Sequence, residues 1–538
     1  MLISSNQKYI HRMHQSILKK SFTLSAIFMA VALTGCGSDK QVQNGQMVGE
    51  QTSHPKNVII MINDGAGVGT WDATAAWQYG GREGMPYHQF PAKYAMTTYP
   101  LNTSNKPTNN TESLVNYDPQ KAWDIQASGN DKLPFKGYEY LSQNATDSAA
   151  AGTALASGTK TYNNAINFDN FGQPVDFITS VAKANGRATG VVTTVPFSHA
   201  TPAAFGAQNI SRNNYGAIAN QMLSQGKLDL IMGTGAPGFN VNGTDCQKLL
   251  SNESKSGCNE KDQYAYISEQ DWKNLEKGSY TPAGSQHAWK VIRDISDFNA
   301  LAAGKLNYDG PIFASPMVAN TIQQARQAEI VGSDSSNPSG TAYIKTVPTL
   351  ETMTKGALQQ LGKNKSGLFL MVEGGATDWS AHTSSCGTEW SYGVCTSQPE
   401  YGRLIEETQD FNNAVAAVIQ WVERYSNWND TLLIVTTDHD NSMPMGANAQ
   451  TIPFELVKSK GIKVMPEISF RPTGNHSNAL VPLWAKGAGS EWFAKRVTGK
   501  DAGYEKYMKL NDGSYINNTD VYAVMKAALQ GKTVEQKK

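Results

Sequence analysis

The chain has 538 residues, of which 40% are hydrophobic and 9% aromatic, and this composition excludes global disorder. Its 46 Lys and Arg residues balance 46 Asp and Glu residues, so net charge gives no general reason to bind nucleic acid or anionic membranes. Charged residues make up only 17% of the chain, against about 25% in ordinary soluble domains, as in many exported proteins. The length fits several domains or one large α/β domain with insertions.

The N-terminus has the pattern of a secretory signal. Lys19 and Lys20 precede an apolar run over residues 22–33, which is shorter than the ~20 residues of a membrane span. The run ends in Leu-Thr-Gly-Cys36, which resembles the bacterial lipobox, although an ordinary signal peptide with a chance cysteine is the alternative. We expect export, a signal peptide over residues 1–35, lipid anchoring at Cys36 and a polar tether over residues 36–56.

The residue after the lipobox cysteine bears on the final membrane. Gly37 stands where an Asp commonly retains lipoproteins at the inner membrane. For a Gram-negative host we therefore expect anchoring at the outer membrane, on the periplasmic side or at the cell surface.

Four further cysteines suit an oxidising compartment. They are Cys246, Cys258, Cys386 and Cys395, and they allow three pairings. The short spacings favour Cys246–Cys258 and Cys386–Cys395. A zinc ribbon is less favoured, because neither pair has the C-x2-4-C spacing.

Apolar runs alternate with helical patterns along residues 57–530. Helical spacing occurs over residues 175–185 and again at Phe411, Val415 and Val418. Such alternation predicts an α/β fold with a large, mainly parallel central sheet and helices on both faces. Residues 102–136 and 233–284 are expected to be surface excursions, and residues 531–538 a polar tail. The expected strands are residues 58–62, 189–195, 228–232, 368–372, 432–435 and 480–484.

Acidic and histidine residues follow several of these strands, where ligands bind in open α/β sheets. A lone Asp after a strand is usually a turn or cap residue. Four carboxylates converging on one cleft, however, would repel one another unless cations lay between them. These residues are Asp64, Glu373, Asp378 and Asp438, with His199, Thr201 and His439 at neighbouring strand ends.

The spacing of these residues suits metal binding. Asp378 and His382 are four residues apart and share one face of a helix. Asp438 and His439 are adjacent at a strand end, and His476 lies in a loop before the run at 480–484. Mixed histidine and carboxylate ligands suit zinc, whereas oxygen ligands such as Glu373 and the Thr201 hydroxyl suit magnesium.

A candidate nucleophile precedes an Ala-rich helix expected over residues 149–157. Ser148 lies at its N-terminus, where the helix dipole and free N–H groups favour phosphate or an alkoxide. A simple Asp/Ser helix cap is the alternative. A nearby metal ion would make a histidine base unnecessary, because it lowers the pKa of the hydroxyl.

Seven segments together resemble the motifs of the alkaline phosphatase family, in the same order, over residues 57–530. The Glu-x4-Asp-x3-His spacing agrees as well. The segments are Ile-Asn-Asp64-Gly, Thr-Asp-Ser148-Ala-Ala, Lys160-Thr-Tyr-Asn, Ala-Thr201-Pro-Ala-Ala, Val-Glu373-Gly with Asp378 and His382, Thr-Asp438-His439, and the loop of His476.

The resemblance implies hydrolysis of small phosphate monoesters through a phosphoserine at Ser148, with Arg212 binding the phosphate oxygens. It also implies two zinc ions and one magnesium ion, no specific nucleic-acid partner, and a possible homodimer. Asp378, His382 and His476 would hold one zinc ion, Asp64, Asp438 and His439 the other, and Asp64, Thr201 and Glu373 the magnesium ion.

The chain departs from the family pattern near the magnesium ligands. His199 and Trp379 stand where some members have Asp and Lys, and Asn63 stands where Gly is frequent. A metal-dependent phosphodiesterase or sulfatase of the same superfamily is the main alternative, and a non-enzymatic surface lipoprotein is the second. Sulfatases need a C/S-x-P-x-R signature, whereas Ser148 is followed by three alanines.

Overall fold

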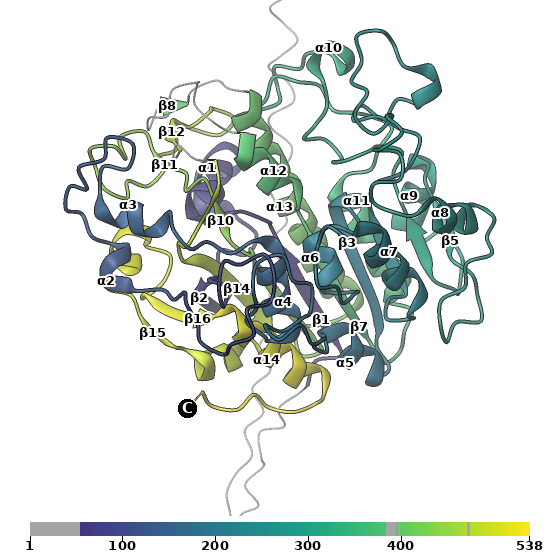
Figure 1. The fold of residues 1–538 in the computed structure, drawn as a ribbon, viewed down its shortest axis with the longest axis horizontal. Coiled ribbons are helices and arrows are strands. Elements are labelled where there is room, and N and C mark those ends of the chain that lie inside the picture. The colour runs from purple at the N-terminus through teal and green to yellow at the C-terminus, as the bar shows by residue number, and fades with distance from the viewer. Residues whose placement is uncertain (1–53, 384–393, 396–398, 471–473, 538) are drawn as a thin grey trace, which may run out of the picture. The chain divides into compact units, whose positions relative to one another are not determined.

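The sheet of the computed structural model runs through the molecule with helices on both sides (Figure 1). The structure describes residues 54–383, 394–395, 399–470 and 474–537. The signal peptide, Cys36, residues 36–53 of the tether and the Cys386–Cys395 pairing lie outside these residues.

Eleven strands of the described residues form the central sheet, in the order β15-β16-β2-β14-β9-β1-β7-β3-β4-β6-β5. They are β1 (Asn57–Ile62), β2 (Ala92–Thr97), β3 (Ala188–Pro196), β4 (Leu230–Thr234), β5 (Lys290–Ile292), β6 (Ile312–Ala314), β7 (Leu368–Glu373), β9 (Thr431–Thr436), β14 (Val481–Gly487), β15 (Gly499–Lys500) and β16 (Ser514–Asn517). Small sheets pair β10 (Asp440–Asn441) with β13 (His476–Ser477), and β12 (Ile468–Ser469) with β11 (Met445–Gly446) and β8 (Val394–Cys395).

The helices of the described residues vary widely in length. They are α1 (Val68–Tyr79), α2 (Pro119–Ala122), α3 (Lys136–Leu141), α4 (Ser148–Ser157), α5 (Ile178–Ala184), α6 (Ala200–Ala204), α7 (Tyr215–Ser224), α8 (Glu269–Glu276), α9 (Ile295–Ala302), α10 (Ala328–Val331), α11 (Leu350–Leu361), α12 (Ala376–Thr383), α13 (Pro399–Tyr425) and α14 (Asn518–Leu529). Short helical turns lie at Arg82–Gly84, Cys246–Lys248, Ser490–Arg496 and Tyr504–Met508.

The two faces of the sheet bury two separate hydrophobic clusters. In β1, Val58, Ile60 and Ile62 pack on the side of α4, α5, α6 and α14. Ile59 and Met61 point the other way, towards α1, α11 and α13. Because successive strand residues face opposite sides, a strand covered on both faces is apolar throughout. This is why β1 appears in the sequence as a continuous apolar run.

All six expected strands are present, and the α/β fold with its mainly parallel sheet is confirmed. Their bounds shift by one to three residues, as for β14, which ends at Gly487. β14 runs antiparallel to both of its neighbours, β9 and β2. The strands β2, β5, β6, β15 and β16 were not predicted from the sequence.

Polar contacts hold the first excursion to the core, whereas the second is closed by an internal disulfide and buries Trp272 and Leu275 in the hydrophobic core. Asn170 is 2% exposed, and its amide donates to the Thr108 hydroxyl at 2.8 Å and to the Asn110 carbonyl at 2.8 Å. The expected Cys246–Cys258 disulfide is present in the second excursion. At the C-terminus, Val534 is buried in the hydrophobic cluster around α14. Within the described part of the chain, no helix combines the length and hydrophobicity that crossing a membrane requires.

A buried carboxyl on α13 makes the stability of this fold depend on pH. Burial and the nearby Asp410 raise the pKa of Glu407 to about 8. Between about pH 4.5 and pH 8 the unfolded chain loses a proton that the folded chain keeps, so the free energy of unfolding falls as pH rises. We expect Glu407→Gln to remove this fall. The difference in free energy of unfolding between the variant and the wild type should then be a few kcal/mol more favourable to the variant at pH 8 than at pH 5. Urea unfolding at both pH values measures the effect.

The matched control is Glu423→Gln, which changes an exposed glutamate of the same helix. It should leave the pH dependence as in the wild type. Equal pH dependence in the Glu407→Gln and wild-type proteins would show that Glu407 ionises normally in the folded state.

Candidate active site

The carboxyl ends of β1, β7, β9 and β3 meet at one edge of the sheet, because these strands are parallel neighbours. Asp64 follows β1, Glu373 ends β7, and Asp438 follows β9. Helix α6 after β3 carries Thr201, and α12 after β7 carries Asp378 and His382. The topology therefore brings together residues that lie far apart in sequence.

Ser148 is the first residue of α4 and is 1% exposed. The preceding Asp147 is the N-cap, and its Oδ1 accepts from the Ala150 N–H at 2.9 Å. The Ser148 Oγ lies 3.2 Å from His439 Nε2. The residue therefore combines a helix N-terminus with a position beside a candidate metal ligand, and the cap is Asp147 rather than Ser148.

Three carboxylates at the strand ends are almost completely buried. Asp64, Glu373 and Asp438 are each at most 1% exposed. The Thr201 hydroxyl donates to Asp64 Oδ2 at 3.3 Å, and the Thr193 hydroxyl donates to Glu373 Oε2. The remaining oxygens, Asp64 Oδ1, Glu373 Oε1 and Asp438 Oδ2, have no hydrogen-bond partner among the described residues.

Burial and mutual repulsion make these carboxylates hard to ionise without a cation. The pKa of Asp64 is raised well above its usual range, mainly by burial and secondly by the charge of Asp438. Burial raises the pKa of Glu373 to about 7, and burial with the charge of Asp378 raises the pKa of Asp438 to about 6. Unpaired buried carboxylate oxygens of this kind are suited to a bound cation.

Close backbone approach lets Asp378 join this cluster. Gly65 has φ of +71°, and a Cβ on this residue would lie 2.7 Å from Asp378 Oδ1. Any larger residue would therefore be strained and would push the carboxylate away. Asn441 Nδ2 donates to Asp378 Oδ1 at 2.7 Å and fixes the carboxylate further.

Two histidines converge on Asp378 with their Nε2 atoms. His382 Nε2 lies 3.3 Å from Asp378 Oδ2, and His476 Nε2 lies 3.3 Å from Asp378 Oδ1. The two Nε2 atoms are 3.2 Å apart. Each Nδ1 instead bonds a backbone carbonyl, that of Gly474 at 2.6 Å or Thr146 at 2.8 Å. Carbonyl bonds at Nδ1 place the lone pair on Nε2, which is the usual arrangement of a metal-binding histidine.

Proximity to Asp378 also sets the charges of these groups. Burial alone would raise the pKa of Asp378, but His382 and His476 hold it well below its usual range. Although burial opposes it, the charge of Asp378 raises the pKa of His382 to about 8. Without a metal ion, protons therefore take the place of the cation between these ligands.

The donor set fits divalent metal ions. The ligand atoms of Asp378, His439 and His476 lie within 4.8 Å of one another, as do those of Asp64, Asp438 and His439. His439 belongs to both groups, and burial with the charge of His476 holds its pKa well below the usual range. A neutral imidazole among buried carboxylates is a suitable zinc ligand.

Arg212 enters the same site from the loop before α7. Its guanidinium bonds Asp147 Oδ2 at 3.0 Å and lies 3.2 Å from His199 Nε2. Burial and the charge of Arg212 lower the pKa of His199 to about 3, so this imidazole is neutral. His199 packs against Trp379, with ring centroids 5.6 Å apart. Arg212 is thus held by one carboxylate, with its fork close to Ser148.

A cavity of about 350 Å³ opens above these groups. It is lined by Ser148, His199, Arg212, Gln324, Asp378, Trp379, His382, Thr383 and His476. Every residue in this lining except Gln324 and Thr383 was a predicted site residue.

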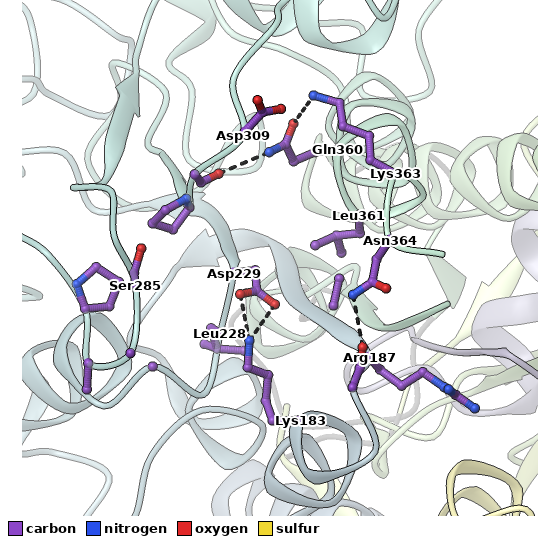
Figure 2. A pocket seen from close by; sticks show the side chains of 18 residues that line it. Lys183, Arg187, Leu228, Asp229, Ser285, Asp309, Gln360, Leu361, Lys363 and Asn364 are labelled. Carbon is purple, nitrogen blue, oxygen red and sulfur yellow. Dashed lines mark hydrogen bonds and ion pairs between the residues drawn. The ribbon is translucent and has the colours of Figure 1, made fainter. Parts of the chain in front are cut away.

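A larger cavity of about 570 Å³ lies at the amino ends of β3 and β4, far from these residues along each strand (Figure 2). Several of its polar groups bond to nearby protein groups: Lys183 Nζ donates to both oxygens of Asp229, at 2.8 and 3.0 Å. Gln360 Nε2 donates to the carbonyls of Tyr308 and Gly310. The smaller cavity, where charged groups converge on unoccupied space, is therefore the candidate active site.

Three contributing residues were missed from the sequence. Asp147 looked like a cap and also holds Arg212. Asn164 accepts at its carbonyl from the Arg212 N–H at 2.8 Å, and its own N–H donates to Asp147 Oδ2 at 3.0 Å. Asn164 directly follows the recognised motif Lys160-Thr-Tyr-Asn, and this position could have indicated that it belongs to the site. Gln324 carries no sequence signal.

Comparison with known proteins agrees with the fold. The family model described as alkaline phosphatase matches residues 55–470. Alkaline phosphatase 4 of Bacillus subtilis is 28% identical over 443 residues, covering 81% of this chain and 73% of that relative. Alkaline phosphatase of Escherichia coli is 28% identical over 435 residues, covering 74% and 79%.

A solved structure of alkaline phosphatase from the Antarctic bacterium TAB5 shares the fold. Its TM-score is 0.51 at 21% identity, with 89% of this chain and 99% of that chain covered. This chain therefore belongs to the alkaline phosphatase family, an enzyme family of phosphomonoesterases.

Proposed function

We propose that the enzyme hydrolyses small phosphate monoesters through a phosphoserine at Ser148, with two zinc ions and one magnesium ion. The observation that carries this proposal is the position of a buried seryl hydroxyl at a helix N-terminus, 3.2 Å from His439 Nε2. Buried carboxylates with unpaired oxygens lie behind it, and Arg212 lines the same cavity.

The proposed ligand sets follow the resemblance to the family, and the grouping of Asp378 with His476, and of Asp64 with Asp438 and His439, supports them. Members of this family are metal-dependent. When bound, the ions supply positive charge that lowers the pKa of a hydroxyl or water and stabilises charge on the departing oxygen. We assign Asp378, His382 and His476 to one zinc ion, Asp64, Asp438 and His439 to the second, and Asp64, Thr201 and Glu373 to magnesium.

The chain's own groups carry the substrate through two displacements. Arg212 binds two phosphate oxygens through its guanidinium fork, and the N–H groups at the start of α4 face the same charge. Ser148 Oγ gives up its proton and forms a bond to phosphorus while the ester P–O bond breaks and the alcohol leaves protonated. Water then attacks phosphorus, the Ser148 P–O bond breaks, and phosphate departs.

His199 and Trp379 bear on the magnesium ligands rather than on the reaction class. A neutral His199 supplies no negative charge beside Thr201, unlike the Asp found at this position in some members. We propose that this pair sets magnesium occupancy, which metal analysis of His199→Asp would test: unchanged magnesium content would contradict it.

The chain also carries features against the alternatives. Ser148 is followed by Ala149, Ala150 and Ala151, so the sulfatase signature is absent. Phosphodiesterases of this superfamily usually use threonine as the nucleophile. Rates with an aryl phosphate monoester, the corresponding diester and the sulfate, measured on protein of known metal content, test the assignment. A preference for the diester or the sulfate would overturn it.

Arg212→Ala should lower kcat/KM and weaken inhibition by inorganic phosphate about ten- to hundredfold. The basis is that a charge-assisted bidentate contact contributes roughly 1.5–3 kcal/mol. Steady-state kinetics with phosphate as inhibitor measures both effects. The control Arg187→Ala removes an arginine at the distant cavity and should change neither. Unchanged phosphate inhibition in folded Arg212→Ala would remove Arg212 from the site.

For localisation we propose export and lipid anchoring at Cys36, with the enzyme at the outer membrane. The lipobox-like Leu-Thr-Gly-Cys36 supports this. Mass spectrometry of the mature N-terminus tests it, and a soluble protein without lipid would contradict it. A homodimer is proposed from the family alone, and light scattering of the mature enzyme would decide it.

A further inference from the structure

Gln324 lines the candidate active-site cavity from a part of the chain that contains none of the recognised motifs. It lies between β6 and α11, and it is 8% exposed. Its side-chain amide makes no hydrogen bond to any of the described residues. A glutamine more than nine-tenths buried thus brings an unused donor and an unused acceptor to the substrate cavity.

The backbone at this position is held firmly by α13. Arg403 donates to the carbonyl of Gln324 at 2.8 Å and to that of Arg326 at 2.7 Å. Arg326 is 1% exposed and pairs with Glu406 at 2.7 Å. The neighbouring Gln323 pairs its amide with the backbone of Ile344. The backbone from which the Gln324 side chain projects is therefore fixed at the cavity wall.

The chemistry of the cavity divides between charged and uncharged groups. Arg212, Asp378, His382 and His476 supply charge, and Ser148 supplies the nucleophile for the phosphoryl group. The uncharged groups of the same lining also include Gln324, Trp379, Thr383 and the neutral His199. A primary amide donates and accepts together, which matches hydroxyl groups that do the same.

We propose that Gln324 is a specificity-determining residue that hydrogen-bonds the alcohol part of the substrate. It favours phosphate monoesters of polyhydroxylated alcohols over those of apolar alcohols. The inference rests on the proposed monoesterase function and adds the class of alcohol. Discrimination arises because an apolar alcohol would cover the amide without offering it a hydrogen-bond partner, and a covered amide without a partner costs more than the net value of the hydrogen bond.

Glycerol 1-phosphate and propyl phosphate test this, because they share a three-carbon chain and differ in two hydroxyl groups. Gln324→Leu should lower kcat/KM for glycerol 1-phosphate about five- to tenfold and that for propyl phosphate by less than about twofold. Inhibition by inorganic phosphate should stay unchanged. Gln324→Met, which is unbranched like glutamine, should give the same pattern and serves if the leucine variant does not fold.

Gln270→Leu is the matched control, because it changes an exposed glutamine of α8 and should alter neither substrate. Equal losses for both esters with weaker phosphate inhibition would place Gln324 on the phosphoryl group and overturn the proposal. Unchanged rates for both esters would overturn it as well. A wild-type enzyme that hydrolyses neither ester would instead refute the proposed function itself.

Discussion

Ser148→Ala is expected to lower kcat/KM for phosphate monoesters by roughly 10³- to 10⁶-fold, the range seen when a nucleophile is removed from an enzyme. Some hydrolysis should persist, because water can still attack a substrate bound by Arg212. That residual reaction is a single displacement and inverts configuration at phosphorus. The wild-type reaction has two displacements and retains configuration. A chiral labelled phosphate ester, turned over by both proteins, separates the two pathways.

Phosphate should also be trapped on Ser148 at acidic pH, where release of the phosphoserine is slower, and detected by peptide mass spectrometry. Ser180→Ala is the matched control, because the Ser180 hydroxyl has no hydrogen-bond partner among the described residues and lies outside the cavity lining. Inversion by the wild type would show that Ser148 is only the first residue of α4. Failure to trap phosphate on it would weigh the same way.

Removal of metal ions is expected to lower activity by at least about 100-fold, because the ions supply several kcal/mol of transition-state stabilisation. Chelation followed by zinc and magnesium should restore it. His476→Ala should bind less zinc, as measured by elemental analysis, whereas the exposed His287→Ala should bind as much as the wild type. A protein shown to be metal-free and fully active would refute the metal assignment.

Stability gives a second measure that does not depend on activity. In the metal-free protein the pKa values of Asp64, Glu373 and Asp438 are raised. Below about pH 4 these carboxyls are protonated and do not repel one another, so their contribution to stability is complete. That contribution is lost as pH rises towards 7, so metal-free protein should melt at a lower temperature at pH 8 than at pH 5. Metal binding requires ionised ligands and should reverse this trend. A metal-free protein equally stable at both pH values would show that these carboxylates do not repel one another in the folded state.

The strands that could be predicted are those buried on both faces. β1 and β7 are continuous apolar runs because each residue contacts one of two hydrophobic layers. β5 is different: it is three residues long at the sheet edge, and Lys290 is exposed. No periodicity distinguishes such a strand from a loop. The reversed direction of β14 depends on the path of residues 437–480, which hydrophobicity does not record.

The residues of the candidate site likewise divide into those that could be predicted from the sequence and those that could not. Asp378 and His382 could be paired because helical spacing is a local property. Asp147 and Arg212 are 65 positions apart, and their contact depends on how the turn at Asn164 folds back. Gln324 lines the cavity from a loop whose carbonyl is bonded by Arg403, 79 positions later in the chain. Contacts that depend on tertiary packing of loops leave no pattern in sequence.

β1 lies at the centre of the sheet, yet both of its partners come late in the chain. Asn57 bonds to Leu368 and to Thr431, which are 311 and 374 positions away. Loop closure over such distances must precede any gain from pairing, so we expect slow folding with exposed apolar strands in early states. A chain ending before residue 431 would leave β1 with an unpaired edge and should aggregate. By the same reasoning, the chain cannot complete its central sheet until synthesis is nearly finished, so it stays without its native core for most of the time that it is being made.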